Sequence, residues 1–286
     1  MRRRPWVWLT GALGAAAIGW GALNATAAPR FTDIPGKKAG TEVDVELVMA
    51  VDISYSMDFD ELKLQREGYV EALRSNEFLN ALKQGAHGKI AVTVVEWAGV
   101  GDQRVVLPWR LIDGPESAQA AANELMAQPV RRAFRTSISG ALMFSAALFE
   151  DNGYRGVRRV IDVSGDGTNN QGPMVTIVRD EVIAKGITIN GLPIMLKEPQ
   201  PGSVDIKELD IYYEDCVIGG PGAFMIPIRE RERFKEAVRT KLVLDIARYD
   251  GMPRVIPASA AAPRISCTIG ELMWQRRWGG GGIDFR

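Results

Sequence analysis

The sequence feature that most constrains the fold is an apolar run, VDVELVMAVDIS, that begins at Val43. Strands buried on both faces of a parallel sheet have such continuous apolar sequences, whereas strands with one wet face alternate apolar and polar residues. We therefore expect a central strand at this position. Similar runs at 90–97, 157–163 and 187–194 predict further strands.

Helical patterns separate these runs. Asp58 stands three residues before Glu61, a spacing typical of a helix-capping box. We expect the other elements at these positions: a strand at 104–111, helices at 115–126, 139–149, 175–185 and 230–248, and a last short strand at 223–228. Strands that alternate with helices predict an α/β fold, with a mostly parallel central sheet and helices on both of its faces.

The N-terminal segment, residues 1–27, has the layout of a secretory signal. It has a basic start (MRRR), an apolar stretch at 6–23 and a small-x-small motif (ATA) at 25–27. We expect cleavage near Ala28, export to the bacterial periplasm and no membrane span in the mature chain. The alternative is a retained N-terminal anchor, since the apolar stretch is barely long enough to cross a bilayer.

Three further segments follow the signal. A linker is expected at 28–42, a domain at 43–250 and a C-terminal extension, partly irregular, at 251–286, where the sequence is rich in proline, alanine and glycine. Cysteines in exported proteins are often paired, so we expect a disulfide between Cys216 and Cys267. Such a bond would tie the extension to the domain; the alternative is two separate buried thiols.

Composition excludes two classes of function. The chain has 35 basic and 35 acidic residues, so it lacks the large positive field that binds nucleic acid through its phosphates. It has one histidine and two cysteines, whereas a zinc site of the usual type needs about four such ligands.

Small oxygen-bearing side chains gather where predicted strands end and helices begin. Asp52, Ser54 and Ser56 follow the first strand, Asp166 follows the strand at 157–163, and Thr136 precedes a helix. In α/β sheets, ligands bind at the carboxyl ends of the strands. Hydroxyl groups with a few carboxylates suit a hard divalent cation. From spacing alone, the same residues could instead be turn and helix-cap residues.

These motifs resemble those of one known family. DISYSM at 52–57 resembles the D-x-S-x-S signature of von Willebrand factor type A (vWA) domains, Thr136 ahead of SGAL resembles their threonine loop, and SGDG at 164–167 resembles their Asp-Gly after the fourth strand. Three more segments resemble a bacterial family of exported vWA-like proteins whose function is uncharacterised: EWAG at 96–99, DVSGDGTNN at 162–170 and CVIGGPGAF at 216–224.

The resemblance implies a Rossmann-like vWA fold and a metal-ion-dependent adhesion site (MIDAS). It implies hydroxyl ligands and carboxylates that coordinate directly or through water, namely Ser54, Ser56, Thr136, Asp52 and Asp166. The implied ion is Mg²⁺, with Mn²⁺ or Ca²⁺ as alternatives. Asp162, inside its strand, competes with Asp166, and Arg135 stands where the family often has glycine.

The function that the resemblance implies is protein binding and not catalysis: the cation would capture a carboxylate of an unknown partner protein. Two alternatives are a metal-dependent, phosphatase-like hydrolase that uses the same acidic loops, and a structural envelope protein with a vestigial site. The motifs include no convincing general base or nucleophile, since the single histidine, His87, lies elsewhere in the sequence. This favours binding over hydrolysis.

Overall fold

The computed structural model describes residues 40–199, 205–247 and 262–278. In these ranges one five-stranded sheet has the order β3-β2-β1-β4-β5. The strands are β1 (Thr41–Asp52), β2 (Ile90–Trp97), β3 (Gln103–Ile112), β4 (Tyr154–Gly165) and β5 (Ile187–Pro193). All neighbours pair in parallel except β3, which runs antiparallel to β2 at one edge. The mostly parallel α/β fold is confirmed.

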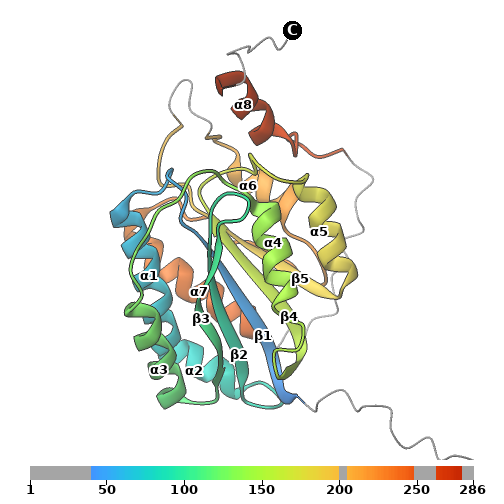
Figure 1. Cartoon of the computed structure of the whole chain (residues 1–286). Helices are drawn as coiled ribbons and strands as arrows, with labels where there is room; N and C mark the ends of the chain where they lie inside the picture. Colours follow the sequence, from blue (N-terminus) through green and yellow to red (C-terminus); the bar gives the residue numbers. More distant parts are fainter. Residues whose placement is uncertain (1–39, 200–204, 248–261, 279–286) are drawn as a thin grey trace, which may run out of the picture. The chain divides into compact units, whose positions relative to one another are not determined.

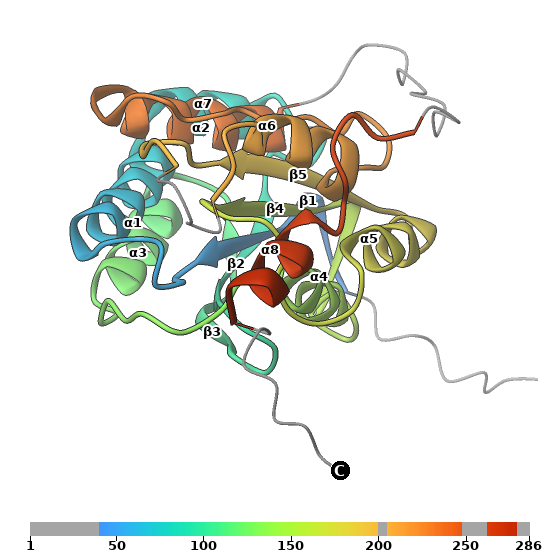
Figure 2. The same ribbon diagram turned by 90° about the horizontal axis from the view of Figure 1, so that it is seen from above.

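Helices cover both faces of the sheet (Figures 1 and 2). They are α1 (Phe59–Arg74), α2 (Asn76–Lys83), α3 (Pro115–Met126), α4 (Ile138–Ala147), α5 (Val175–Ala184), α6 (Leu209–Tyr212), α7 (Phe234–Ile246) and α8 (Ile269–Trp278). A π-helical turn, η1 (Tyr213–Val217), continues α6, and a 3₁₀ turn, η2 (Arg231–Arg233), precedes α7. None of the described helices is both long and apolar enough to cross a membrane.

The apolar run in β1 is explained by two separate cores. Met49 packs in a core with α1, α3 and α7, while Val48 and Ala50 pack in a second core with α4, α5 and η1. Successive side chains of a strand point to opposite faces, so a strand buried on both sides must be apolar at consecutive positions. Val48, Met49 and Ala50 are all fully buried.

Several elements differ from those expected from the sequence. The segment 223–228 forms only isolated bridges beside β5, at Met225 and Ile228. Pro227 lies between these bridges, and proline has no N–H for a continuous ladder. The helix expected at 230–248 begins later, at Phe234, after η2. The first strand begins at Thr41, inside the expected linker.

Three helices were not anticipated: α2, α6 with its continuation η1, and α8. Ser75 ends α1 in an extended conformation, and its hydroxyl accepts a hydrogen bond from the N–H of Phe78 at 3.1 Å, so one residue stops α1 and caps α2. The extension, expected to be partly irregular, contains α8. The expected signal at 1–27 and the linker up to residue 39 lie outside the described residues.

A buried ion-pair network joins β4 to α7. The Nζ of Lys241 lies 2.6 Å from an Asp162 oxygen and 2.7 Å from an Asp245 oxygen, and all three side chains are buried. Asn190 of β5 donates to Asp245 at 2.7 Å, and the Tyr69 hydroxyl faces Asp162 at 3.4 Å. The lysine therefore places one positive charge between two buried carboxylates.

Replacing Lys241 with methionine should lower the free energy of unfolding by about 3–5 kcal/mol, because two buried carboxylates lose their shared cation. Urea unfolding followed by circular dichroism measures the change. The matched control is Lys235→Met on the same helix, whose exposed pairs with Glu67 and Glu71 should contribute at most about 1 kcal/mol. Equal losses in the two variants would contradict the assignment.

Candidate metal site

The candidate site lies at the carboxyl end of the two central strands. Val51 of β1 pairs with Ser164 of β4, so Asp52 and Asp166 leave the sheet side by side. The chain after β1 enters α1 on one face, whereas the chain after β4 leads to α5 on the other. Such a switch point leaves a crevice between the loops, where α/β proteins bind their ligands.

A chain of hydrogen bonds links four of the five predicted residues. An Asp52 oxygen accepts from the N–H of Ser54 at 2.7 Å, and the hydroxyls of Ser54 and Ser56 lie 2.8 Å apart. The Ser56 hydroxyl then donates to Asp166 at 2.6 Å. These contacts bring together residues separated by 110 positions in the sequence.

Thr136 completes the set from a third loop. Its N–H donates to the Asn170 side chain at 3.0 Å, and its carbonyl accepts from the N–H of Asn170 at 2.8 Å. Gly167 faces the threonine, since a Cβ built at Gly167 would lie 3.6 Å from the Thr136 hydroxyl oxygen. The structure thus places all five predicted residues at one edge of the sheet.

The donor set fits a hard divalent cation. The second oxygen of Asp52, Oδ2, is buried and has no hydrogen-bond partner in the described part of the chain. A buried carboxylate oxygen without a partner is costly, and a cation would satisfy it. Two carboxylates and three hydroxyls are oxygen ligands of the kind that Mg²⁺, Mn²⁺ and Ca²⁺ accept. In the described ranges, no three His, Cys, Asp or Glu side chains lie together as a metal cluster, and the candidate site itself offers two carboxylates, so its other ligands would have to be hydroxyls and water.

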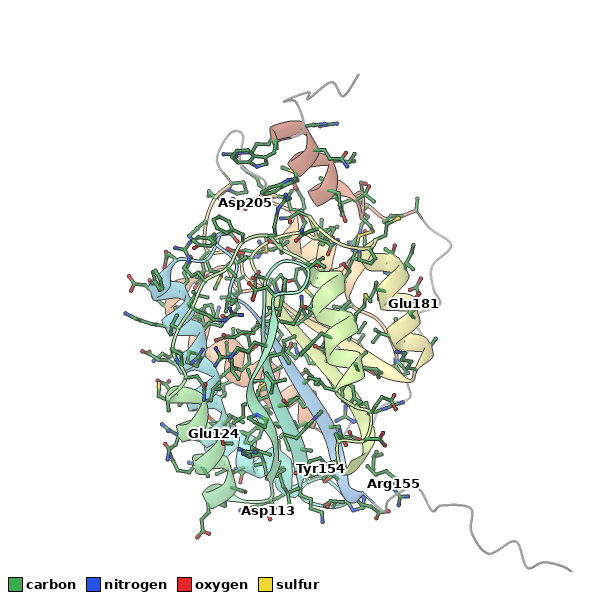
Figure 3. The ribbon with its side chains drawn as sticks, in the orientation of Figure 1. Asp113, Glu124, Tyr154, Arg155, Glu181 and Asp205 are labelled. Atoms are coloured by element: carbon green, nitrogen blue, oxygen red, sulfur yellow. A yellow bond between two sulfur atoms is a disulfide. The ribbon has the colours of Figure 1, made fainter. Side chains whose placement is uncertain are left out.

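Both carboxyl groups bind protons more tightly than usual. Burial, and then the charge of Asp166, raises the pKa of Asp52 well above its ordinary value. Burial raises the pKa of Asp166 to about 7, and the nearby charge of Asp205 also raises it. Figure 3 shows Asp205 at this upper end of the molecule, opposite Asp113 and Tyr154. The site is therefore short of positive charge.

The structure distinguishes Asp166 from its competitor. Asp162 lies in the core of the sheet, bound by Lys241, and contacts none of the five site residues in the described hydrogen bonds. Asp166 accepts the hydrogen bond of Ser56. Position 166 is thus the one at which a carboxylate faces the serine loop.

Arg135, which stands where vWA domains often have glycine, has a φ of 73°, in the left-handed region that favours glycine. Its guanidinium carbon lies 3.5 Å from the ring centroid of Trp274 in α8. The loop that carries Thr136 is therefore held from outside by the C-terminal extension.

The extension also holds the loop after β4. The Asn169 amide donates to Glu271 of α8 at 2.7 Å, and Gly270 approaches so closely that a Cβ there would lie 2.1 Å from the Asn169 carbonyl oxygen. Figure 2 looks down on this edge and shows α8 over it, beside α4. The predicted disulfide between Cys216 and Cys267 is present and ties the start of α8 to η1.

Sequence reasoning missed these supporting residues. The motif at 162–170 includes Asn169 and Asn170 but indicates no role for them, and the composition of 251–286 predicts a partly irregular tail where α8 lies. The spacing of Cys267 to the following apolar residues, Ile269 and Leu272, was the available signal for a helix anchored by a disulfide. Lys197, whose ammonium donates to the Ser56 carbonyl at 2.8 Å, carried no signal in the sequence.

Comparison with known proteins agrees with this architecture. Residues 42–250 match a family described as "Protein of unknown function (DUF1194)". Among curated proteins, none matches the chain. The fold is the vWA fold, as predicted.

Three solved structures illustrate the likeness. Proximal thread matrix protein 1 from the mussel byssus has a TM-score of 0.51 at 13% identity, over 72% of this chain and 49% of that one. The pilus adhesin SpaC from Lactobacillus rhamnosus GG has a TM-score of 0.51 at 13% identity, over 73% and 31%. A vWA protein from Catenulispora acidiphila has a TM-score of 0.48 at 19% identity, over 72% of this chain and 43% of that one. This chain therefore spans less than half of each. At identities this low, the two structures with a TM-score of 0.51 show a shared fold only.

Gly270→Ala should push α8 away from the loop after β4, because the added methyl group would overlap a backbone carbonyl. We expect faster hydrogen exchange at the amides of Asn169 and Asn170, measured by mass spectrometry, and unchanged exchange in β1. The matched control is Gly114→Ala, where an added Cβ meets nothing within 4 Å. Unchanged exchange at the two asparagines would show that α8 does not hold this loop.

Proposed function

The chain belongs to the family described as a protein of unknown function (DUF1194), and we propose that it is a protein-binding module that captures an acidic group of a partner through a divalent cation. One observation carries the proposal: a buried, unpartnered Asp52 oxygen lies at the head of a chain of hydroxyl and carboxylate oxygens. A structural turn would satisfy that oxygen with an N–H or hydroxyl donor.

Five residues would hold the ion: Asp52, Ser54, Ser56, Thr136 and Asp166. When bound, the cation would supply a Lewis-acidic position open to an incoming carboxylate. The two aspartates would only balance the charge of a dication, and contact through water by either of them would leave the ion under-neutralised toward its open position, where a partner's carboxylate would be attracted. We propose Mg²⁺ first, with Mn²⁺ or Ca²⁺ as alternatives. The mussel protein has been solved with a zinc-occupied MIDAS motif, which is a property of that protein.

Binding is favoured over hydrolysis by the groups around the site. Burial raises the pKa of the Tyr213 hydroxyl well above its ordinary value, which makes this side chain a poor base at neutral pH. Lys197 is paired with Glu61. His87 lies at the far end of the sheet, where its backbone N–H donates to the Asp44 side chain near the start of β1. A panel of phosphate and ester substrates tests the hydrolase alternative.

We also propose that the chain works outside the cytoplasm, in the periplasm. The disulfide between Cys216 and Cys267 supports this, because such bonds persist in oxidising compartments. The signal-like segment at 1–27 supports it independently. Mass spectrometry of the exported protein, with a mature N-terminus near Ala28, tests the processing step.

Asp52→Ala should weaken Mg²⁺ binding at least about tenfold, because it removes a direct ligand and the acceptor of the Ser54 N–H. Ser54→Ala should weaken binding less, since water can replace a hydroxyl. Isothermal titration calorimetry with Mg²⁺ and Mn²⁺ measures both, with circular dichroism to verify the fold. The matched control is Asp60→Ala, an exposed aspartate on α1. A folded Asp52→Ala protein that binds the ions normally would refute the site.

Binding of Mg²⁺ should weaken as the pH falls through about 7, because protons then occupy Asp166 and Asp52. The raised pKa values also mean that the cation-free fold gains stability from these two groups at low pH and loses it as the pH rises toward 7. The increase in melting temperature on adding Mg²⁺ should therefore be larger at about pH 8 than at about pH 5.5. Asp166→Asn should flatten this dependence; an equal Mg²⁺ effect at both pH values in the native protein would contradict it.

A further inference from the structure

An exposed group of aromatic side chains borders the candidate metal site. We call it the aromatic ridge, and it consists of Tyr55, Phe59 and Phe134. Their side chains are 48%, 53% and 73% exposed, respectively, and the rings of Tyr55 and Phe134 stack with centroids 4.3 Å apart. Large apolar side chains gathered on a surface mark interaction sites more often than single ones do.

The ridge is built from the same loops as the site. Tyr55 lies between Ser54 and Ser56, and Phe134 lies two residues before Thr136. The two loops are joined by a hydrogen bond from the N–H of Ala133 to the Ile53 carbonyl at 2.9 Å. The ridge and the site are therefore held together by the same two loops.

Arg132 gives the ridge a positive charge. Its guanidinium carbon lies 4.7 Å from the ring centroid of Tyr55 and 5.4 Å from that of Phe59. It donates to the Tyr55 carbonyl, its Nε is buried without a hydrogen-bond partner, and no carboxylate in the described part of the chain pairs with it. The neighbouring Arg131, by contrast, is paired with Asp102 and Glu96.

We infer that the aromatic ridge and Arg132 dock an acidic segment of a partner protein, in which apolar residues flank the carboxylate that reaches the metal site. This inference rests on the proposed function and names the chemistry of its partner. The apolar flank would cover the exposed rings of Tyr55 and Phe134, and a second carboxylate would pair with the guanidinium of Arg132.

Charge favours such a segment over a membrane surface. Recognition of anionic lipid takes a cluster of about four to eight basic side chains. Here the arginine on the ridge has no acidic partner, but its neighbour Arg131 is neutralised, and Lys197 beside the site is paired with Glu61. Arg135 on the same loop has its guanidinium stacked on Trp274. Two such guanidinium groups are fewer than a lipid surface takes, so the apolar ridge with Arg132 fits a short acidic peptide better than a lipid headgroup layer.

Two labelled synthetic peptides of equal length test the inference, each with two aspartates, flanked either by leucines or by serines. With Mg²⁺ present, fluorescence polarisation should show that the native protein binds the leucine peptide about tenfold more tightly, which corresponds to burial of one or two apolar side chains. Phe134→Ser should abolish the difference. The matched control, Val157→Ser, changes a side chain that is 70% exposed on β4 and should retain it. Arg132→Gln should weaken binding of both peptides.

Calorimetry with Mg²⁺ separates this inference from the proposed function. Phe134→Ser should bind Mg²⁺ like the native protein, because the phenyl ring is not a ligand. If the native protein binds Mg²⁺ normally but binds the two peptides with equal affinity, or binds neither, the inference about the ridge is wrong and the proposed metal site stands. Absence of Mg²⁺ binding in the native protein would overturn both.

Two other occupants would also overturn the inference. A dimer in analytical ultracentrifugation that dissociates on Phe134→Ser would assign the ridge to a second copy of the chain. Sedimentation with phosphatidylglycerol vesicles that is lost on Phe134→Ser would assign it to a membrane.

Discussion

The register between β1 and β4 is the constraint on which the rest of the site depends. Pairing of Val51 with Ser164 brings the ends of the two strands level, so that Asp52 and Asp166 emerge together. A slip of one residue would turn every side chain of β1 to the other face. Because both faces of β1 are packed, the two cores fix this register, and burial far from the site thus determines which carboxylates meet.

The same burial raises the pKa of both carboxyl groups at the site. Two carboxylates meet where the desolvation of each raises its pKa, and the nearest ammonium, on Lys197, is already paired with Glu61. In the core below, the comparable pair of Asp162 and Asp245 shares the ammonium of Lys241. Of these two carboxylate pairs in the described residues, one has an internal cation and the other does not, and the second is the pair that an external cation could stabilise.

Much of this was predictable from local signals. The apolar run of β1, the capping box at Asp58 and the helix at 115–126 follow from the burial, hydrogen-bonding and backbone preferences of residues close together in the chain. The sequence could not predict features that depend on distant contacts. The interruption around Pro227 reflects a missing ladder donor, and the role of α8 depends on Gly270 meeting Asn169 across the fold. The exposure of Phe134 likewise depends on the three-dimensional fold, because the surrounding elements leave most of its side chain uncovered.

The contact between Arg135 and Trp274 shows that the extension is part of the site's architecture. A left-handed φ costs a residue other than glycine about 1 kcal/mol, and stacking of a guanidinium on an indole contributes about 0.5–1 kcal/mol or more. The strain in one site loop is therefore offset by a helix that lies beyond residue 250, where the family match ends. Glycine would suit that loop in a chain without α8, whereas arginine suits it here because the indole of Trp274 lies against its guanidinium.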